Sequence, residues 1–256
     1  MNMELKNILK DLLEGRLDID EATSKVMSFG YIPVMDIAKA DTHRIHRTGY
    51  PEAILAEGKT PQDTLAIVRS HLESCGRALI TRVSDSHLEY LNENFSSELV
   101  DWHPRARSYI VSTGKEIKKT GSKIGIISGG TADIGVAEEA YVVAREMGCD
   151  VLKAYDVGVA GIHRLYPEIS KLKQNNVKAV VVAAGREGTL PAVVSGLIDV
   201  PVIGLPVSTG YGAGGNGEAA LLSMLQSCSI IAVVNIDAGF VAGAIAARIA
   251  NIAVEP

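Results

Sequence analysis

Continuous apolar runs alternate with helix-compatible segments through the second half of the chain. The runs are Lys123–Ser128, Val151–Val157, Ala179–Ala184, Val202–Pro206 and Ile230–Ile236. Runs of this length without polar alternation are typical of strands buried on both faces, as in a parallel sheet covered by helices. Because crossover connections are right-handed, few topologies remain. We therefore predict an α/β fold whose C-terminal half is a flavodoxin-like, five-stranded parallel sheet in the order 2-1-3-4-5.

Small and polar residues follow four of these runs, in loops that begin after Ser128, Val157, Ala184 and Pro206. Ligands of open parallel sheets bind outside the carboxyl ends of the strands, so we expect these loops to converge on one site for a small phosphorylated molecule. The turn from Ser128 to Asp133 has two glycines before a predicted helix, whose N–H groups favour a phosphate or carboxylate; an ordinary capped turn explains the same residues. The loop 210–217 has five glycines in eight residues and is either a mobile lid or a backbone cradle.

The first half of the chain has a mixed pattern. Helical spacing of apolar residues predicts four helices, over Met1–Glu14, Asp20–Phe29, Pro61–Ser74 and Ser86–Asn94. Short strands are predicted at Ile54–Ala56, Ala78–Arg82, Leu99–Trp102 and Ser108–Ile110. Residues 112–122 are polar and rich in glycine and lysine, as in a linker. We predict an N-terminal α+β domain over residues 1–115 and a second domain over residues 122–256.

Composition limits the partners and the compartment. The 256 residues are 47% hydrophobic and have a formal charge of −5, so the charge gives no reason to expect nucleic acid or an anionic membrane. No apolar run approaches the length that crosses a bilayer. Three cysteines, an odd number without metal-type spacing, indicate a reducing compartment. We expect a cytoplasmic protein that acts on a small molecule.

Loop residues of the second half have the chemistry of an acid–base and anion-binding site. His163 and Arg164 follow a strand and would supply an acid or base and an anion clamp, although such a pair also suits a solvated helix start. Glu187 is a candidate general base at a strand end, and an ion pair with Arg186 is the alternative.

A dense polar block occupies residues 41–52. It contains two arginines, two histidines and two carboxylates. Strand-like alternation would place Asp41, His43 and Arg47 on one side, as phosphate- and metal-binding groups. The alternative is a charged, exposed hairpin.

Cys228 lies between a predicted helix, Glu218–Ser227, and the last apolar run. A cysteine there is commonly a packing residue, and the C-terminus of a helix raises the pKa of a thiol. Cys75 and Cys149 each lie at the end of a predicted helix and fit packing roles. Composition alone therefore does not identify a nucleophile.

Four segments of the second half resemble the PurE family of aminoimidazole ribonucleotide carboxylases and mutases. They are the Ser-Gly-Gly-Thr-Ala-Asp turn at 128–133, the pair His163-Arg164, and residues 183–191 and 201–207. The likeness covers residues 122–252. The PurE family has Gly-Ser-Asp-Ser-Asp and Ser-Ala-His-Arg where this chain has the first two segments, and it lacks an N-terminal domain.

Motifs along essentially the whole chain resemble the LarB family of pyridinium-3,5-biscarboxylic acid mononucleotide synthases. They are Asp41-x-x-Arg44-x-x-Arg47-x-Gly49-x-x-Glu52, residues 128–140, Gly158–Arg164, Pro206–Gly212, and Ser227-Cys228-Ser229 with residues 233–237. The resemblance implies carboxylation of the pyridinium ring of nicotinic acid adenine dinucleotide and hydrolysis of its phosphoanhydride with release of AMP. This is the first step toward the nickel-pincer nucleotide. The resemblance also implies that Cys228 is the covalent residue.

That chemistry assigns roles to the other residues. An electron-poor pyridinium ring does not attack carbon dioxide, whereas addition of a thiolate at position 4 makes position 5 an enamine carbon that does. We expect Glu187 to act as the base, and Asp41 and Glu52 to hold a magnesium ion that polarises the anhydride for water, with carbon dioxide or bicarbonate as co-substrate. Substrate contacts are expected from Arg44, Arg47, Ser128, Asp133, His163, Arg164, Ser208 and Tyr211.

Two other functions are compatible with the sequence, and the last helix predicts an oligomer. The first alternative is an aminoimidazole ribonucleotide carboxylase or mutase of the PurE type, which needs no Cys228. The second is a nucleotide-sensing module that binds its ligand without releasing AMP. The apolar last helix, Ala238–Ile252, would leave a large apolar patch on a monomer, so we expect a homo-oligomer, an octamer by resemblance to both families.

Overall fold

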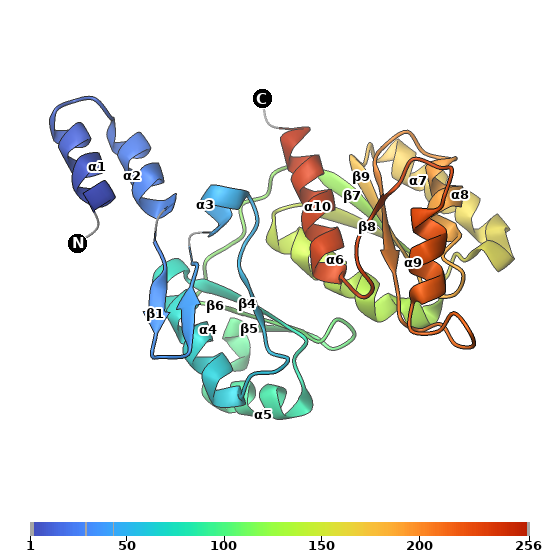
Figure 1. The fold of residues 1–256 in the computed structure, drawn as a ribbon, viewed down its shortest axis with the longest axis horizontal. Helices are drawn as coiled ribbons and strands as arrows, with labels where there is room; N and C mark the ends of the chain where they lie inside the picture. The colour runs from blue at the N-terminus through green and yellow to red at the C-terminus, as the bar shows by residue number, and fades with distance from the viewer. Residues whose placement is uncertain (1–2, 29, 43, 255–256) are drawn as a thin grey trace. The chain divides into compact units, whose positions relative to one another are not determined.

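The computed structural model describes residues 3–28, 30–42 and 44–254, and the chain forms two compact units (Figure 1). Unit 1 comprises Met1–Asp101 and Tyr109–Lys115, and unit 2 comprises Trp102–Ser108 and Glu116–Pro256.

Unit 1 is an α+β structure, as predicted. A helical hairpin and a two-stranded antiparallel ribbon come first: α1 (Met3–Leu13), α2 (Ile19–Ser28), β1 (Ile32–Val34) and β2 (Ala38–Ala40). Met1 and Phe29, which the predicted helices included, lie outside the described residues. The remaining helices are α3 (Arg44–Thr48), α4 (Pro61–Cys75) and α5 (Asp85–Asn94), with a short 3-10 turn at Ser97–Leu99. A four-stranded sheet has the order β3 (Ala53–Leu55), β4 (Arg77–Thr81), β6 (Ser108–Ser112), β5 (Val100–His103).

Local chemistry fixes both ends of α4, the main helix of unit 1. The Thr60 side chain accepts a hydrogen bond from the Asp63 N–H at 3.1 Å, and Pro61 occupies the first turn, where no N–H is needed. Gly76 ends the helix in the left-handed conformation, with φ of 72°. The helix buries Leu65 and Val68 and so provides a rigid support for the side chains on its surface.

Unit 2 contains a five-stranded, all-parallel sheet in the order β8-β7-β9-β10-β11, which confirms the predicted order 2-1-3-4-5. The strands are β7 (Lys123–Ser128), β8 (Asp150–Ala154), β9 (Ala179–Ala184), β10 (Val202–Pro206) and β11 (Ala232–Val233). The last strand is shorter than predicted, because only Ala232 and Val233 pair with β10. Ile230, which the prediction placed in that strand, has a side chain that is 93% exposed.

Helices cover both faces of this sheet. They are α6 (Ile134–Glu146), α7 (Leu165–Gln174), α8 (Leu190–Ser195), α9 (Glu218–Leu225) and α10 (Gly239–Ile252), with 3-10 turns at Thr131–Asp133 and Val159–Arg164. Buried side chains of α7, α8 and α9 form one cluster with Val180 and Val182 of β9. On the other face α10 packs along α6 (Figure 1). The two helices lie so close that a Cβ at Gly243 would collide with the carbonyl of Ala140.

Among the described residues, no helix is long and apolar enough to cross a membrane.

Candidate active site

The loops that follow β7, β8, β9 and β10 converge at the carboxyl end of the sheet, as predicted. They enclose a pocket of about 360 Å³. Its lining comprises residues 129–133, Asp156, residues 158–160, residues 184–187, Thr189, Leu190 and Thr209. This is the edge at which parallel sheets bind ligands.

Asp133 ties two of these loops together. Its side chain is buried; one carboxylate oxygen accepts the Gly130 N–H and the other accepts the Thr209 hydroxyl, each at 2.9 Å. Gly185 passes so close that a Cβ on it would lie 2.8 Å from the Asp133 carboxylate. The close packing holds the Asp133 carboxylate in a fixed position at the pocket wall.

The environment of Asp133 favours its protonated form. Burial raises the pKa of the carboxyl, and the nearby charge of Glu187 raises it further, while the hydrogen bonds from Thr209 and Gly130 oppose the change. A carboxyl with a raised pKa that shares a pocket with a second carboxylate is suited to holding and moving a proton. The pocket can therefore support general acid–base chemistry.

Glu187 and Arg186 lie together on the pocket wall, and both are exposed. The Arg186 guanidinium lies over the ring of Tyr211, 4.0 Å from its centroid, in a cation–π contact. Among the described residues, no ion pair joins Arg186 to Glu187, and the role of Glu187 as a base remains a prediction. The same contact links the glycine-rich loop to the pocket wall through Tyr211, whose side chain is 74% exposed.

Ser128 and Arg164 hold the loop after β8 and do not line the pocket. The buried Ser128 hydroxyl accepts the Asp156 N–H at 3.2 Å, and Arg164 donates to the Asp156 carboxylate at 2.5 Å. His163 is exposed and also lies outside the lining. Contact of these three residues with substrate remains a prediction.

Three further residues shape the loops around β10. The Ser208 N–H donates to the Asp237 carboxylate at 2.9 Å, which fixes the start of the glycine-rich loop. Two further residues were not predicted from the sequence: Thr209, which holds Asp133, and Asp156, which lines the pocket. Asp156 has φ of 58°, a left-handed conformation that aspartate adopts more readily than most residues, and its place after a strand was the available signal.

Cys228 does not lie at this pocket. Its side chain is exposed and lines a separate, mostly apolar hollow of about 720 Å³, formed by residues that precede β10 and β11. These residues are at the amino end of the sheet, and none of the three cysteines lines the loop pocket. Cys149 is buried, which raises the pKa of its thiol, and Cys75 donates to the carbonyl of His71 at 3.0 Å.

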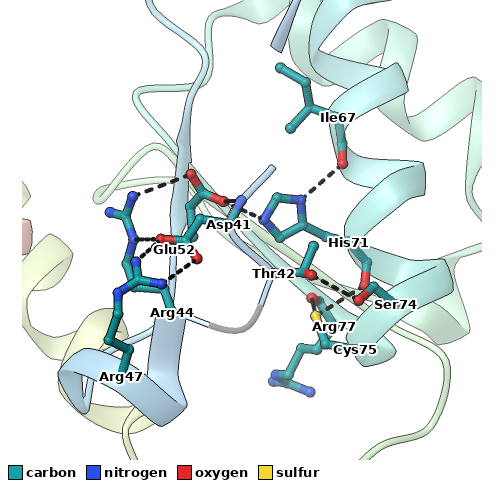
Figure 2. Close-up of polar contacts among 10 residues, drawn as sticks. All are labelled: Asp41, Thr42, Arg44, Arg47, Glu52, Ile67, His71, Ser74, Cys75 and Arg77. Atoms are coloured by element: carbon teal, nitrogen blue, oxygen red, sulfur yellow. Dashed lines mark hydrogen bonds and ion pairs between the residues drawn. The ribbon is translucent and has the colours of Figure 1, made fainter. Parts of the chain in front are cut away.

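The block at residues 41–52 is a loop and a short helix in unit 1 (Figure 2). The expected alternation, and the hairpin alternative, are wrong because α3 begins at Arg44. Arg44 and Arg47 lie one turn apart on this helix and therefore face the same Asp41 carboxylate, to which Arg44 Nε donates at 3.0 Å. His43 lies outside the described residues.

Glu52 is held from several sides. Its carboxylate accepts the Asp41 N–H at 2.6 Å and lies 3.1 Å from His71 Nε2 on α4, with Arg44 at 3.5 Å. The other His71 ring nitrogen faces the Ile67 carbonyl at 3.0 Å, so Figure 2 shows the ring bridging α4 and Glu52.

Burial alone would raise the pKa of Glu52, but the hydrogen bonds from His71 and Asp41 and the charge of Arg44 lower it. Burial would also raise the pKa of Asp41, but the hydrogen bonds and charges of Arg47 and Arg44 lower it.

These carboxylates do not fit the predicted magnesium ion. Every oxygen of Asp41 and Glu52 faces an arginine, histidine or backbone donor, and a hard divalent cation needs such oxygens for itself. In the described ranges, no group of three His, Cys, Asp or Glu side chains is placed to hold a metal. The arrangement suits an anion better, because the guanidinium side chains of Arg44 and Arg47 are 34% and 42% exposed.

We expect Glu52→Gln to lower the free energy of unfolding by about 1–3 kcal/mol at pH 7, because it weakens a network of charged hydrogen bonds. The pKa of Glu52 is below its ordinary value of 4.5, so ionised Glu52 stabilises the fold above that pH, and this contribution is lost as the pH falls through the lowered pKa. Urea unfolding at neutral pH and at about pH 3 should therefore show that the free energy of unfolding falls less on acidification in the variant than in wild type. Glu57→Gln, at an exposed carboxylate paired with Arg82, is the control and should change stability by less than about 0.5 kcal/mol. Equal acid losses in Glu52→Gln and wild type would contradict this account.

The sheet order and the pocket at its carboxyl end define an α/β protein of the doubly wound, flavodoxin-like class. The chain belongs to the AIR carboxylase family, whose model matches residues 123–255. A second model, described as LarB/PurE-like N-terminal domain, matches residues 32–113. The two together give a LarB-like architecture with a PurE-like C-terminal half.

Several known proteins are similar to all or to half of this chain. The uncharacterized protein MJ0165 of Methanocaldococcus jannaschii is 38% identical over 98% of this chain and 99% of its own. The N5-carboxyaminoimidazole ribonucleotide mutase of Pyrococcus horikoshii is 31% identical over 50% of this chain and 72% of its own. A crystal structure of Treponema denticola PurE covers 50% of this chain and 87% of its own, at 19% identity and a TM-score of 0.37.

Proposed function

We propose that this protein carboxylates the pyridinium ring of nicotinic acid adenine dinucleotide and hydrolyses its phosphoanhydride, giving pyridinium-3,5-biscarboxylic acid mononucleotide and AMP. The observation that supports this proposal is the LarB/PurE-like N-terminal domain, with its arginine–carboxylate block, on the same chain as an AIR carboxylase domain. The mutase of Pyrococcus horikoshii matches only half of this chain.

Ring carboxylation is assigned to Cys228 and to the loop pocket. The Cys228 thiolate adds to ring position 4, which converts the pyridinium cation into a neutral dihydropyridine. Position 5 then attacks carbon dioxide, supplied as such or from bicarbonate, and forms a carbon–carbon bond. Glu187 removes the proton from position 5, and the thiolate leaves with its electron pair, which restores the aromatic ring. No electron is gained or lost overall, so the step needs no redox partner.

Anhydride hydrolysis is assigned to the block in unit 1. Arg44 and Arg47 present partly exposed guanidinium groups, which bind phosphate oxygens in a bidentate manner. Their positive charge would stabilise the negative charge that develops as water attacks the anhydride. The carboxylates of Asp41 and Glu52 face other donors, so the proposed step uses no metal ion.

Arg47→Ala should weaken substrate binding by about 1.5–3 kcal/mol, the contribution of a hydrogen bond to a charged group, which is roughly a tenfold to hundredfold rise in Kd. Arg44 still pairs with Asp41 in this variant, so the local fold should persist. Isothermal titration with nicotinic acid adenine dinucleotide measures the change. Arg16→Ala, at an exposed ion pair with Asp11 in the same unit, is the matched control. Unchanged binding and turnover in Arg47→Ala would show that the block is a solvated surface.

The test of the proposed function is a product analysis. The protein is incubated with nicotinic acid adenine dinucleotide and bicarbonate, with and without magnesium, and the products are identified by mass spectrometry. A dicarboxylated mononucleotide together with AMP supports the proposal. Turnover of carboxyaminoimidazole ribonucleotide instead would support the alternative suggested by the names of the mutase relatives. Binding of the dinucleotide without AMP release would indicate a sensor.

We also propose a homo-oligomer assembled through α10. Val241, Ile245 and Ile252 lie on one side of this helix and have side chains that are 44%, 37% and 55% exposed. Light scattering should return a multiple of the 27.1 kDa chain mass, and Ile245→Asp should lower it. A wild-type mass near 27.1 kDa at micromolar concentration would rule this assembly out.

A further inference from the structure

We infer that His71 is a buried imidazolium, protonated on both ring nitrogens, whose charge makes the block at residues 41–52 a receptor for a diphosphate. This inference rests on the proposed function, which assigns phosphate binding and anhydride hydrolysis to that block. His71 acts on the two arginines through Glu52 and Asp41, so it is a positioning residue and does not itself touch the substrate.

Hydrogen-bond acceptors face both nitrogens of the His71 ring. Nδ1 lies 3.0 Å from the Ile67 carbonyl oxygen, and Nε2 lies 3.1 Å from the Glu52 carboxylate (Figure 2). A carbonyl oxygen only accepts, so Nδ1 must carry a proton. A neutral ring would then direct the lone pair of Nε2 at a carboxylate oxygen, in a side chain that is only 3% exposed. A proton on Nε2 replaces this repulsion by a charge-assisted hydrogen bond.

The contacts of Glu52 put the proton on the histidine and not on the carboxylate. The oxygen that faces His71 also accepts the Asp41 N–H at 2.6 Å, and the other oxygen lies 3.5 Å from the Arg44 guanidinium. All of these contacts favour the ionised carboxylate, and they are the causes of its lowered pKa. Glu52 therefore accepts from His71.

His87 shows that a buried histidine of unit 1 does not always need this charge. It lies on α5 and is 6% exposed. One ring nitrogen faces the Lys59 carbonyl at 3.1 Å, and the other lies 2.5 Å from the Ser84 hydroxyl. A hydroxyl can donate as well as accept, so a neutral His87 satisfies both contacts. His71 and His87 differ in this one partner.

The charge of His71 decides the charge of the block. With His71 protonated, three positive side chains (Arg44, Arg47 and His71) meet the two carboxylates of Asp41 and Glu52, which leaves a net charge of +1. With a neutral His71 the same groups sum to zero. The two guanidinium groups lie one turn apart and are partly exposed, an arrangement that suits the adjacent phosphoryl groups of a diphosphate.

A second contact of α4 holds the loop without His71. The Ser74 hydroxyl donates to the Thr42 hydroxyl at 2.8 Å, about one turn along the helix, and Thr42 is buried (Figure 2). Loss of the imidazolium should therefore leave the start of the block against α4. The effect of charge can thus be measured apart from the position of the loop.

Neutron diffraction from crystals of the full chain near neutral pH tests the charge directly, because ordinary X-ray structures do not show these hydrogens. We expect deuterium on both ring nitrogens of His71 and on one ring nitrogen of His87. A His71 ring with deuterium on one nitrogen would overturn the imidazolium. The measurement uses wild type, so it decides the charge state even if a variant fails to fold.

Binding of inorganic pyrophosphate, measured by isothermal titration near neutral pH without divalent ions, tests the consequence. His71→Gln keeps a donor toward Glu52 but has no charge, and loss of one charge a few ångströms behind the arginines should raise Kd by about threefold to tenfold. His87→Gln is the matched control, at a buried histidine outside the block, and should bind like wild type. Equal Kd values for wild type and a folded His71→Gln would overturn the inference, as would a wild type that does not bind pyrophosphate. Failure of the proposed function is a different result: wild type would bind pyrophosphate but form no dicarboxylated mononucleotide.

Discussion

Cys228→Ser should abolish carboxylation while the fold and the binding of the dinucleotide are retained. The replacement is nearly isosteric and the side chain is exposed, so the stability should change by less than about 0.5 kcal/mol. A serine hydroxyl stays protonated near neutral pH and does not add to the ring. Loss of a covalent nucleophile typically lowers turnover by at least about a thousandfold.

The same variant distinguishes a nucleophile from a structural cysteine. Intact-protein mass spectrometry with a pyridinium dinucleotide should show an adduct on wild type and none on Cys228→Ser. Cys75→Ser is the control, because its hydroxyl can donate to the same carbonyls of His71 and Arg77; it should keep both the adduct and the activity. Carboxylation by Cys228→Ser at the wild-type rate would defeat the covalent mechanism.

The sheet of unit 2 could be predicted because each of its strands is a continuous apolar run with a loop at its end. The six residues of β9 are buried throughout, as expected of a central strand in a parallel sheet that helices cover on both faces. The last strand was predicted too long, because apolar residues at an exposed edge follow the same pattern as buried ones. Ile230 is such a residue.

The candidate site was predicted less completely than the sheet. Which residues reach the pocket depends on the end of the strand at which they lie and on where their side chains point. Cys228 comes before its strand, whereas the four loops come after theirs, and in a parallel sheet this difference alone puts them at opposite ends. Ser128, the last residue of β7, points into the interior, where it holds Asp156. The block at residues 41–52 depends on His71, nineteen residues beyond Glu52, and no local pattern shows that contact.

Glu187→Gln should lower the rate of carboxylation by about a hundredfold to ten-thousandfold, the usual contribution of a general base. The amide cannot accept the proton at ring position 5, so the ring carboxylated at position 5 cannot regain its aromaticity and release the thiolate. The side chain is exposed, so the fold should persist. Asp133 is buried on the same pocket wall with a raised pKa, but the Gly130 N–H and the Thr209 hydroxyl already occupy its oxygens.

The diagnostic result is accumulation of the cysteine adduct. If Glu187 removes the proton after the carbon–carbon bond forms, the variant should hold substrate on Cys228 longer than wild type, and intact mass should show a carboxylated adduct while free product falls. A merely structural Glu187 would lower adduct and product together. Glu218→Gln, at an exposed glutamate in the first turn of α9, is the matched control and should keep wild-type turnover. Full activity in Glu187→Gln would move the base to another group, and Asp133 and Asp156 are the other carboxylates that line the same pocket.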